Sequence, residues 1–360
     1  MTVRERMLAV YRGQTPDRVP VGIYSRYLPR GEGERLARGL GCGIIDYYPA
    51  VSMLAPPWHF GEGYLSEVRG CECRVDYLWE KGTLLYRRSY RTPLGELYQI
   101  MEPDPSGMGS EHIRKQYITR PEDYAIAIYI VENTVIRSNE AALRRRLDDL
   151  GGDGVVLGRL DRAPYQKLLI ELVGAETLFI DLYTNPEPAL ELMGAMERKL
   201  DEGFALALET AADVFWQPDN ITSDMTPPAY FEKYCQPFYR KRAEALRRAD
   251  RPYVIHMDGR LSALRGLIGK EEADVLESVS LPEIGGDLTY RQAVELFADV
   301  TVLPNFPSNL CMGGEGEIRD AVAAMLREAS GKPFMLQVSE DLPPEEWRRI
   351  LPILCEQAIS

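Results

Sequence analysis

The sequence lacks the short motifs that mark several common enzyme classes. Its 360 residues contain no Gly-x-x-x-x-Gly-Lys-Ser/Thr loop, no Gly-x-Gly-x-x-Gly turn after a predicted strand and no Gly-x-Ser-x-Gly elbow. These absences argue against a P-loop nucleotide site, a Rossmann dinucleotide site and a hydrolase nucleophile elbow. Only three histidines are present to serve as a general base. A hydrolytic triad is therefore poorly supported.

Cysteine pairs and long apolar runs are also missing. The six cysteines are scattered, and no CxxC pair suggests a zinc ribbon. Cys71 and Cys73 are only one residue apart, a spacing that does not favour a disulfide between them. No run of about 18 apolar residues occurs, and the charged start Met-Thr-Val-Arg-Glu-Arg is unlike a signal peptide. We expect a cytoplasmic protein with no membrane partner.

Positive charge is in short supply, since the net charge is −13. Non-specific nucleic-acid binding needs a basic surface that displaces counterions, so a nucleic-acid partner is not expected. The hydrophobic content of 45% and charged content of 27% are typical of a globular protein with a large core. The composition therefore favours an enzyme or a small-molecule binding protein.

Predicted strands and helices alternate along most of the chain, and this pattern indicates a parallel sheet. Eight predicted strands begin at Val19, Gly43, Gly154, Ala212, Tyr253, Asp274, Val300 and Pro333. Eight such units favour a closed (β/α)8 TIM barrel, and an open doubly wound sheet is the competing fold. We expect residues 1–360 to form a single barrel domain.

One stretch breaks the alternation. From about residue 59 to residue 117 the chain carries β-formers such as those in 73–79 and 84–90, separated by turn signals at Lys81-Gly82 and Thr92-Pro-Leu-Gly95. We interpret it as an antiparallel β excursion inserted after the second barrel strand. It would serve as a lid or as a docking surface.

The segment Arg251-Pro-Tyr-Val-Ile-His-Met-Asp-Gly259 reads as a short buried strand. Because side chains alternate along a strand, His256 and Asp258 point to the same face. In a parallel barrel, the carboxyl ends of the strands hold the active site. The competing interpretation is an ordinary hydrogen-bonded histidine followed by an aspartate that caps a helix.

Further polar residues follow the other predicted strands, and we expect them at the same mouth as substrate-binding or catalytic groups. They are Arg26, Tyr48, Arg159, Gln217, Asp219, Asn220, Glu277, Asn305 and Glu340. Asp219 shares its parity with Phe215 and Gln217 and is expected to face inward. The parity of Glu340 leaves its direction open. His256, Asp258, Glu277 and Glu340 offer nitrogen and oxygen ligands of the kind that zinc accepts.

Several segments together resemble the uroporphyrinogen decarboxylase superfamily. They are residues 4–13, 16–21, 92–95, 178–187, 219–220, 231–237 and 256–259, in family order over nearly the whole chain. The resemblance implies a (β/α)8 barrel with its site at the carboxyl ends of the strands. It also implies one of two chemistries, porphyrinogen decarboxylation or methyl transfer with a corrinoid.

The chain departs from both patterns. Decarboxylases of the family use two arginines near Arg26, and Gly22 stands where the first would be. Thiol-methylating relatives hold zinc with His-x-Cys and a late Cys, whereas Asp258 takes the Cys place here and Glu340 lies near the late one. Carboxylates are harder ligands than thiolates, so their presence at these two positions argues against a thiol acceptor. Two options remain: a metal held by His256, Asp258 and Glu340, or acid catalysis by Asp219, Asp258 or Glu340 without a metal.

The resemblance therefore predicts a corrinoid-dependent methyltransferase. One party would be a corrinoid protein carrying a cobalamin, and the other an O- or N-methylated small molecule or a folate. Porphyrinogen decarboxylation is the first alternative, and a non-catalytic small-molecule binding barrel is the second. A homodimer is also expected from the resemblance.

Overall fold

The computed structural model describes residues 1–59, 61, 63–104 and 111–359. Contacts between residues in space divide the chain into two compact units. The first unit comprises residues 1–48, 140–159 and 211–360, and the second comprises residues 49–139 and 160–210. The single domain over residues 1–360 stays a prediction. Among the described residues, no helix combines the length and apolarity needed to cross a membrane.

The sheet that carries the candidate site has eight parallel strands in the order β13-β12-β11-β10-β9-β2-β1-β14. The strands are β1 (Val21–Tyr24), β2 (Gly43–Pro49), β9 (Gly154–Arg159), β10 (Val214–Gln217), β11 (Tyr253–His256), β12 (Val275–Val279), β13 (Thr301–Pro304) and β14 (Leu336–Val338). A parallel bridge between Asn305 and Gln337 joins the two ends of this order. The predicted (β/α)8 barrel is confirmed.

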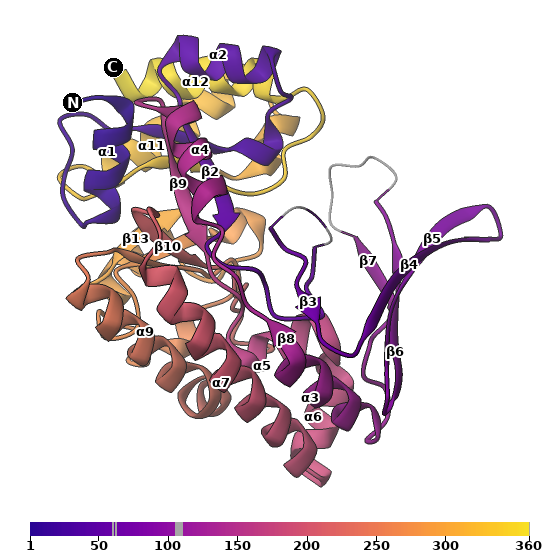
Figure 1. The fold of residues 1–360 in the computed structure, drawn as a ribbon. Helices are drawn as coiled ribbons and strands as arrows, with labels where there is room; N and C mark the ends of the chain where they lie inside the picture. The colour runs from indigo at the N-terminus through magenta and orange to yellow at the C-terminus, as the bar shows by residue number, and fades with distance from the viewer. Residues whose placement is uncertain (60, 62, 105–110, 360) are drawn as a thin grey trace. The chain divides into compact units, whose positions relative to one another are not determined.

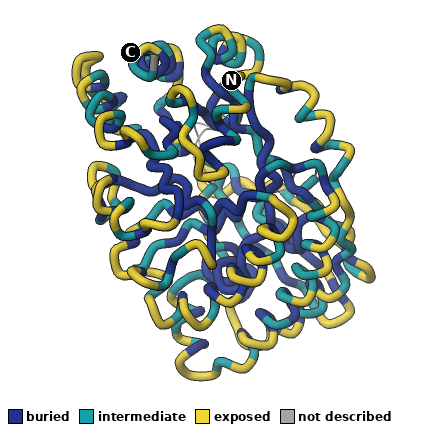
Figure 2. The backbone as a smooth tube through the Cα atoms, turned by 90° about the vertical axis from the view of Figure 1, so that its left-hand side faces the viewer, coloured by how far each residue is buried: buried dark blue, intermediate teal, exposed yellow. Residues whose placement is uncertain are grey.

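Helices alternate with these strands in the first unit. They are α1 (Val3–Tyr11), α2 (Glu32–Leu40), α4 (Glu140–Leu150), α8 (Pro228–Tyr230), α9 (Gln236–Arg248), α10 (Tyr290–Leu296), α11 (Glu315–Glu328) and α12 (Trp347–Ile359). α11 shows how they pack: Ile318, Val322 and Met325 recur at helical spacing and are the buried residues of that helix. Every residue of β1, β9, β10 and β11 is buried, whereas α11 carries both buried and exposed residues; Figure 2 colours the backbone by this burial.

The second unit contains the predicted excursion. β4 (Glu72–Glu80), β5 (Thr83–Thr92), β6 (Gly95–Glu102) and β7 (His112–Lys115) form an antiparallel sheet in chain order, and β4 and β5 make a long hairpin (Figure 1). Lys81 and Gly82 have φ values of 50° and 86°, which a two-residue hairpin turn requires. The excursion after the second barrel strand is therefore confirmed.

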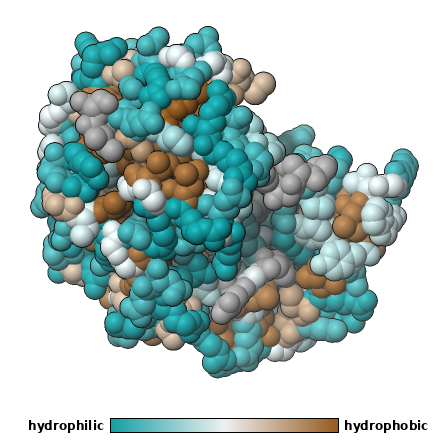
Figure 3. Space-filling view, turned by 90° about the horizontal axis from the view of Figure 1, so that it is seen from above, coloured by the Kyte–Doolittle hydropathy of each residue, from teal (hydrophilic) through white to brown (hydrophobic). Residues whose placement is uncertain are grey.

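The rest of the second unit is mainly helical. It contains α3 (Asp123–Asn133), α5 (Pro164–Lys167), a π-helical turn (Leu168–Leu172), α6 (Ala175–Thr184) and α7 (Glu187–Leu208), together with the short pair β3 (Glu67–Val68) and β8 (Thr134–Val135). The face drawn in Figure 3 is largely hydrophilic, with hydrophobic residues showing in separate areas. Such a face is typical of a chain with 27% charged residues.

Candidate functional site

The parallel register of the barrel brings the candidate site together. His256 is the last residue of β11 and stands beside Glu277 of β12, while Trp216 of β10 stands beside Arg159 of β9. Partners in a parallel sheet point to the same face, so these side chains meet inside the barrel near the carboxyl ends of the strands. All of them belong to the first unit.

His256 is held between three carboxylates. Its Nδ1 lies 2.7 Å from Oε2 of Glu277, which is fully buried. Its Nε2 lies 3.6 Å from Oδ2 of Asp258 and 3.5 Å from Oε1 of Glu340. The contact of Nδ1 with Glu277 fixes the orientation of the ring. The other two contacts place Nε2 opposite the carboxylates of Asp258 and Glu340. His256, Asp258 and Glu340 are thus brought together, and Glu340 does face the site.

Glu277 accepts hydrogen bonds from several neighbours besides His256. Trp216 donates through Nε1 at 2.9 Å, and the Tyr24 hydroxyl and the Gln337 amide also donate to the Glu277 carboxylate. Burial alone would raise the pKa of Glu277, but the hydrogen bonds and the charge of His256 outweigh it and lower that pKa. Glu277 is therefore an ionised anchor for the histidine.

Asp258 and Glu340 each have a polar neighbour that orients them. Asn220 donates from Nδ2 to Oδ2 of Asp258 at 2.6 Å, and Ser278 donates from Oγ to Oε1 of Glu340 at 2.7 Å. Ser278 has a φ of 62° and sits where the pairing of β12 with β13 shifts register. A left-handed residue at a bulge is strained, and such strain is common at functional sites.

Burial works against a charged His256, but the contacts with Asp258, Glu277 and Glu340 outweigh burial and raise its pKa well above 6.5. The pKa of Asp258 is lowered: burial opposes this, and the contacts with His256 and Asn220 prevail. The raised pKa favours the protonated imidazole, and the lowered pKa favours the carboxylate form of Asp258.

Aromatic rings line the interior beside the histidine. The Trp216 ring lies 5.6 Å from that of His256 and 5.0 Å from that of Tyr47, and Tyr47 lies 5.4 Å from Tyr24. The sequence pointed to Tyr48 instead, but the Arg146 guanidinium of α4 lies 4.3 Å over the Tyr48 ring. The expected direction of Tyr48 is wrong, because alternation along β2 turns Tyr47 inward.

The remaining predicted residues divide into two groups. Arg159 lies with its guanidinium carbon 5.6 Å from the Trp216 ring, and Asn305 accepts hydrogen bonds from Ser339. Arg26 follows β1 in a short 3-10 turn and pairs with Asp341 at 3.7 Å. These three lie with the carboxyl ends of the strands, as predicted.

Gln217 and Asp219 lie on a different face. Gln217 accepts from the hydroxyl of Tyr253, which is on the opposite face of β11 from His256. Asp219 accepts from the hydroxyl of Tyr239 in α9 at 2.5 Å. The expectation that Asp219 continues an inward row is wrong, because Trp216 occupies the inward position of β10. Catalytic and substrate-binding roles for the two residues stay predictions.

A metal ion fits the donor set around Nε2 of His256. Ligand atoms of His256, Asp258 and Glu340 all lie within 4.8 Å of one another. Two ligands at about 2.1 Å from a tetrahedral zinc lie about 3.4 Å apart, close to the 3.5 and 3.6 Å separations from Nε2. Glu277 on Nδ1 completes the carboxylate–histidine arrangement that commonly supports a metal ligand.

Glycine at position 22 lies at a close approach of side chains. Gly22 is on β1, and a Cβ there would meet Cδ1 of Ile45 at 2.9 Å and Sδ of Met335 at 3.0 Å. A longer side chain would therefore require Ile45 and Met335 to shift. Arg26 and Arg159 remain as the basic side chains among the predicted site residues.

Comparison with known proteins places the chain in a family. Residues 142–347 match the model of the family described as uroporphyrinogen decarboxylase (URO-D). A methyltransferase from Methanosarcina mazei is similar in structure, with a TM-score of 0.60 and 13% sequence identity over 100% of this chain and 98% of that chain. A B12-independent methionine synthase from Shewanella sp. has a TM-score of 0.41 and 10% identity over 81% and 76% of the two chains. No curated protein sequence matches the chain.

The structural likeness to the Methanosarcina protein supports the barrel fold over the full length of both chains. The family match spans more than half of the 360 residues and includes the segment with His256, Asp258, Glu277 and Glu340. The chain therefore belongs to the uroporphyrinogen decarboxylase (URO-D) family.

Proposed function

We propose that this chain is a URO-D family methyltransferase. It would move a methyl group between a corrinoid carried by a partner protein and an O- or N-methylated small molecule or a folate. One observation carries the proposal: the Nδ1 of His256 is fixed by Glu277 while its Nε2 faces the carboxylates of Asp258 and Glu340. This arrangement suits assistance to a leaving oxygen or nitrogen better than it suits an anionic porphyrinogen.

The donor set offers two ways to assist the leaving atom. When bound, zinc at His256, Asp258 and Glu340 supplies Lewis acidity, and the corrinoid supplies a carrier for the methyl group. Without a metal, the raised pKa of His256 keeps a proton on Nε2, and this proton can pass to the leaving atom. Asp258 is the weaker acid candidate because its pKa is lowered.

The surroundings of the histidine suit a small, partly apolar substrate. Tyr24, Tyr47 and Trp216 provide ring faces for packing and exclude water from the barrel interior. The Nδ2 of Asn305 and the Oε1 of Gln337 are buried and make no hydrogen bond within the described part of the chain. Two such atoms, one donor and one acceptor, would bind a polar group of the substrate.

Methyl transfer to free cob(I)alamin tests the proposal directly. The purified chain would be mixed with cob(I)alamin and a panel of O- and N-methylated donors, and methylcobalamin followed by its absorbance. We expect turnover with at least one donor, and loss of at least a hundredfold in His256→Ala. His112→Ala is the matched control, because His112 is an exposed histidine of β7.

The same preparations would be analysed for zinc and assayed with uroporphyrinogen in the absence of a corrinoid. Zinc present in the wild type and in His112→Ala but lost from His256→Ala supports the metal-assisted route. Methyl transfer without zinc supports the proton on Nε2. Carbon dioxide release from uroporphyrinogen, with no methyl transfer from any donor, would overturn the proposal in favour of decarboxylation. Inactivity in both assays would favour a binding protein.

A further inference from the structure

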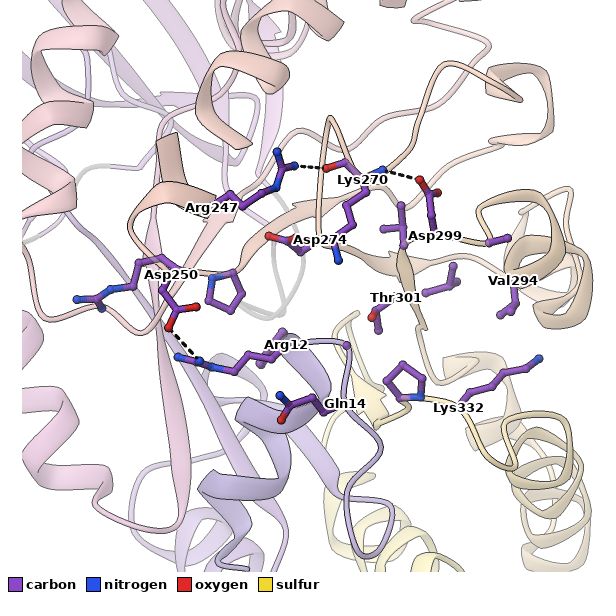
Figure 4. Close-up of a pocket in the computed structure, with 18 of the residues that line it drawn as sticks. Arg12, Gln14, Arg247, Asp250, Lys270, Asp274, Val294, Asp299, Thr301 and Lys332 are labelled. Atoms are coloured by element: carbon purple, nitrogen blue, oxygen red, sulfur yellow. Dashed lines mark hydrogen bonds and ion pairs between the residues drawn. The ribbon is translucent and has the colours of Figure 1, made fainter. Parts of the chain in front are cut away.

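A cavity lies at the opposite ends of the barrel strands from His256. It has a volume of about 460 Å³ and is drawn in Figure 4. Pro252, Asp274, Val300 and Pro333 line it, and each precedes one of the strands β11 to β14. Pro252 and His256 are four residues apart, so the two sites are separated by about 13 Å along β11. The volume is within the range of small-molecule sites, which is about 300–1,000 Å³.

The cavity is positive although the chain is strongly acidic. Its basic residues are Arg12, Arg247, Arg251, Lys270 and Lys332, and its acidic residues are Asp250, Asp274 and Asp299. The whole chain has 42 basic and 55 acidic residues, so the balance here is reversed. An excess of cations around a concave surface favours an anionic ligand.

The carboxylates of the cavity already have partners. Asp250 pairs with Arg12 at 3.4 Å, Asp274 accepts the backbone N–H of Tyr253 at 2.9 Å, and Asp299 accepts the backbone N–H of Lys270 at 3.1 Å. These contacts orient the three carboxylates, and the basic residues around the cavity still outnumber the acidic ones by five to three.

Lys270 is the cation that enters the cavity. In Figure 4 its side chain runs inward and its ammonium ends between Asp274 and Thr301. Within the described residues, the Lys270 ammonium makes no ion pair with a carboxylate. The Arg247 guanidinium donates to the Lys270 carbonyl at 2.6 Å, which supports the backbone from which this side chain extends. An ammonium that points into a cavity and has no counter-ion can bind an anion there.

A hydroxyl group adds a polar contact on the inner side. The Thr301 hydroxyl faces the cavity in Figure 4, although the residue is only 7% exposed. A hydroxyl beside an ammonium supplies a second hydrogen-bond donor to an anion.

We propose that this cavity binds a small molecule through a phosphate group, with the Lys270 ammonium as the principal contact and the Thr301 hydroxyl as a second donor. A phosphate offers several strong acceptor oxygens to the ammonium and the hydroxyl at once. The site is separate from the proposed methyl-transfer centre, whose surplus of carboxylates around His256 repels anions.

Calorimetric titration of the full chain with sodium phosphate and with sodium pyrophosphate tests the proposal. Chloride would hold the ionic strength constant, because screening weakens exposed charges. We expect saturable binding at one site per chain. Lys270→Met should weaken it about tenfold or more, and Thr301→Val should weaken it severalfold. Lys233→Met is the matched control, since Lys233 is an exposed lysine outside the cavity.

His256→Ala should bind both anions as the wild type does, which separates this site from the methyl-transfer centre. No saturable heat with either anion up to about 10 mM would overturn the proposal, since that limit corresponds to a binding free energy of only about 3 kcal/mol. Equal affinity in Lys270→Met and Lys233→Met would also overturn it. Because Lys270 is exposed, loss of folding is not expected to obscure the result.

Discussion

Two charged clusters among the described residues differ in the balance of their charges. In the second unit, Lys167 contacts Asp161 and Glu171, both at 2.9 Å, and Arg162 contacts Glu171 at 2.8 Å. That group holds two cations and two carboxylates in direct contact. In the first unit, one imidazole faces three carboxylates, and two of the distances are 3.5 and 3.6 Å. Lys167, Asp161, Glu171, Arg162, His256 and Glu277 are buried, whereas the side chains of Asp258 and Glu340 are 24% and 33% exposed.

The difference separates a structural network from a binding site. Burial lowers the pKa of Lys167, but Asp161 and Glu171 outweigh burial and raise it, so the group stays charged and compensated. Around His256 the negative charge exceeds the positive charge. The carboxylate oxygens of Asp258 and Glu340 lie 3.6 and 3.5 Å from Nε2, close to the separation of two ligands bound to one metal ion. An excess of like charge in a partly buried site is costly unless something binds there. The compensated charges around Lys167 are typical of a structural network, and the excess of carboxylates around His256 supports our proposal that this cluster binds a cation or a reacting group.

Lys167→Met should have the largest effect on stability. It leaves two buried carboxylates without their shared cation, and breaking a buried ion pair costs about 3–5 kcal/mol. The measurement is the free energy of urea unfolding, followed by circular dichroism. Lys199→Met is the matched control: Lys199 pairs with the exposed Glu202 at 2.9 Å, and such a pair contributes about 1 kcal/mol or less. Equal losses in both variants would remove the distinction between the clusters.

Glu340→Gln should weaken zinc binding, whereas Lys167→Met should weaken the fold. It should reduce zinc affinity about a hundredfold, because a neutral amide replaces one of three ligands. The free energy of unfolding should change little, because the variant loses both the attraction of Glu340 to His256 and its repulsion from Asp258. Competition with a chromophoric chelator measures the affinity, and Asp341→Asn, one residue away, is the control. A loss of stability comparable to that of Lys167→Met would mean that the His256 cluster is a structural network as well.

Glu277→Gln should reduce zinc affinity by a smaller amount, about 10–100-fold, because Glu277 orients His256 without being a ligand. In the variant the one remaining side-chain oxygen can still accept some of the hydrogen bonds that Glu277 accepts from Tyr24, Trp216 and Gln337. The same chelator competition measures this effect. If Glu277→Gln lost more affinity than Glu340→Gln, Glu277 would be the better candidate for a direct ligand.

The sequence predicted those parts of the site that follow from strand periodicity. His256 and Asp258 share a face because the period of two is fixed by the backbone, and Glu277 stands beside His256 once both strands are recognised. Parity alone does not say which face is inward. This is why Asp219 was assigned inward instead of Trp216, and Tyr48 instead of Tyr47.

Past the ends of the strands the alternation of side chains no longer applies, so the sequence did not predict the other features of the site. The direction of Glu340 depends on the turn after β14 and on Ser278, whose left-handed backbone no sequence pattern indicated. The barrel and the excursion were predictable because alternation and turn residues repeat over many residues. The cation-rich cavity was not, because its residues come from five separate segments.

Ser278 allows the smallest and most specific test of the His256 cluster. Ser278→Gly and Ser278→Ala both remove the hydroxyl that donates to Glu340, so both should lower zinc affinity severalfold in the same chelator competition. They should differ in stability, because glycine accepts a φ of 62° without the strain that alanine retains. We expect Ser278→Gly to be more stable than Ser278→Ala by about 1 kcal/mol in urea unfolding. If the two variants bound zinc equally to wild type, the Ser278 hydroxyl would hold the bulge without orienting Glu340. If alanine were the more stable, the left-handed backbone at Ser278 would not be a source of strain.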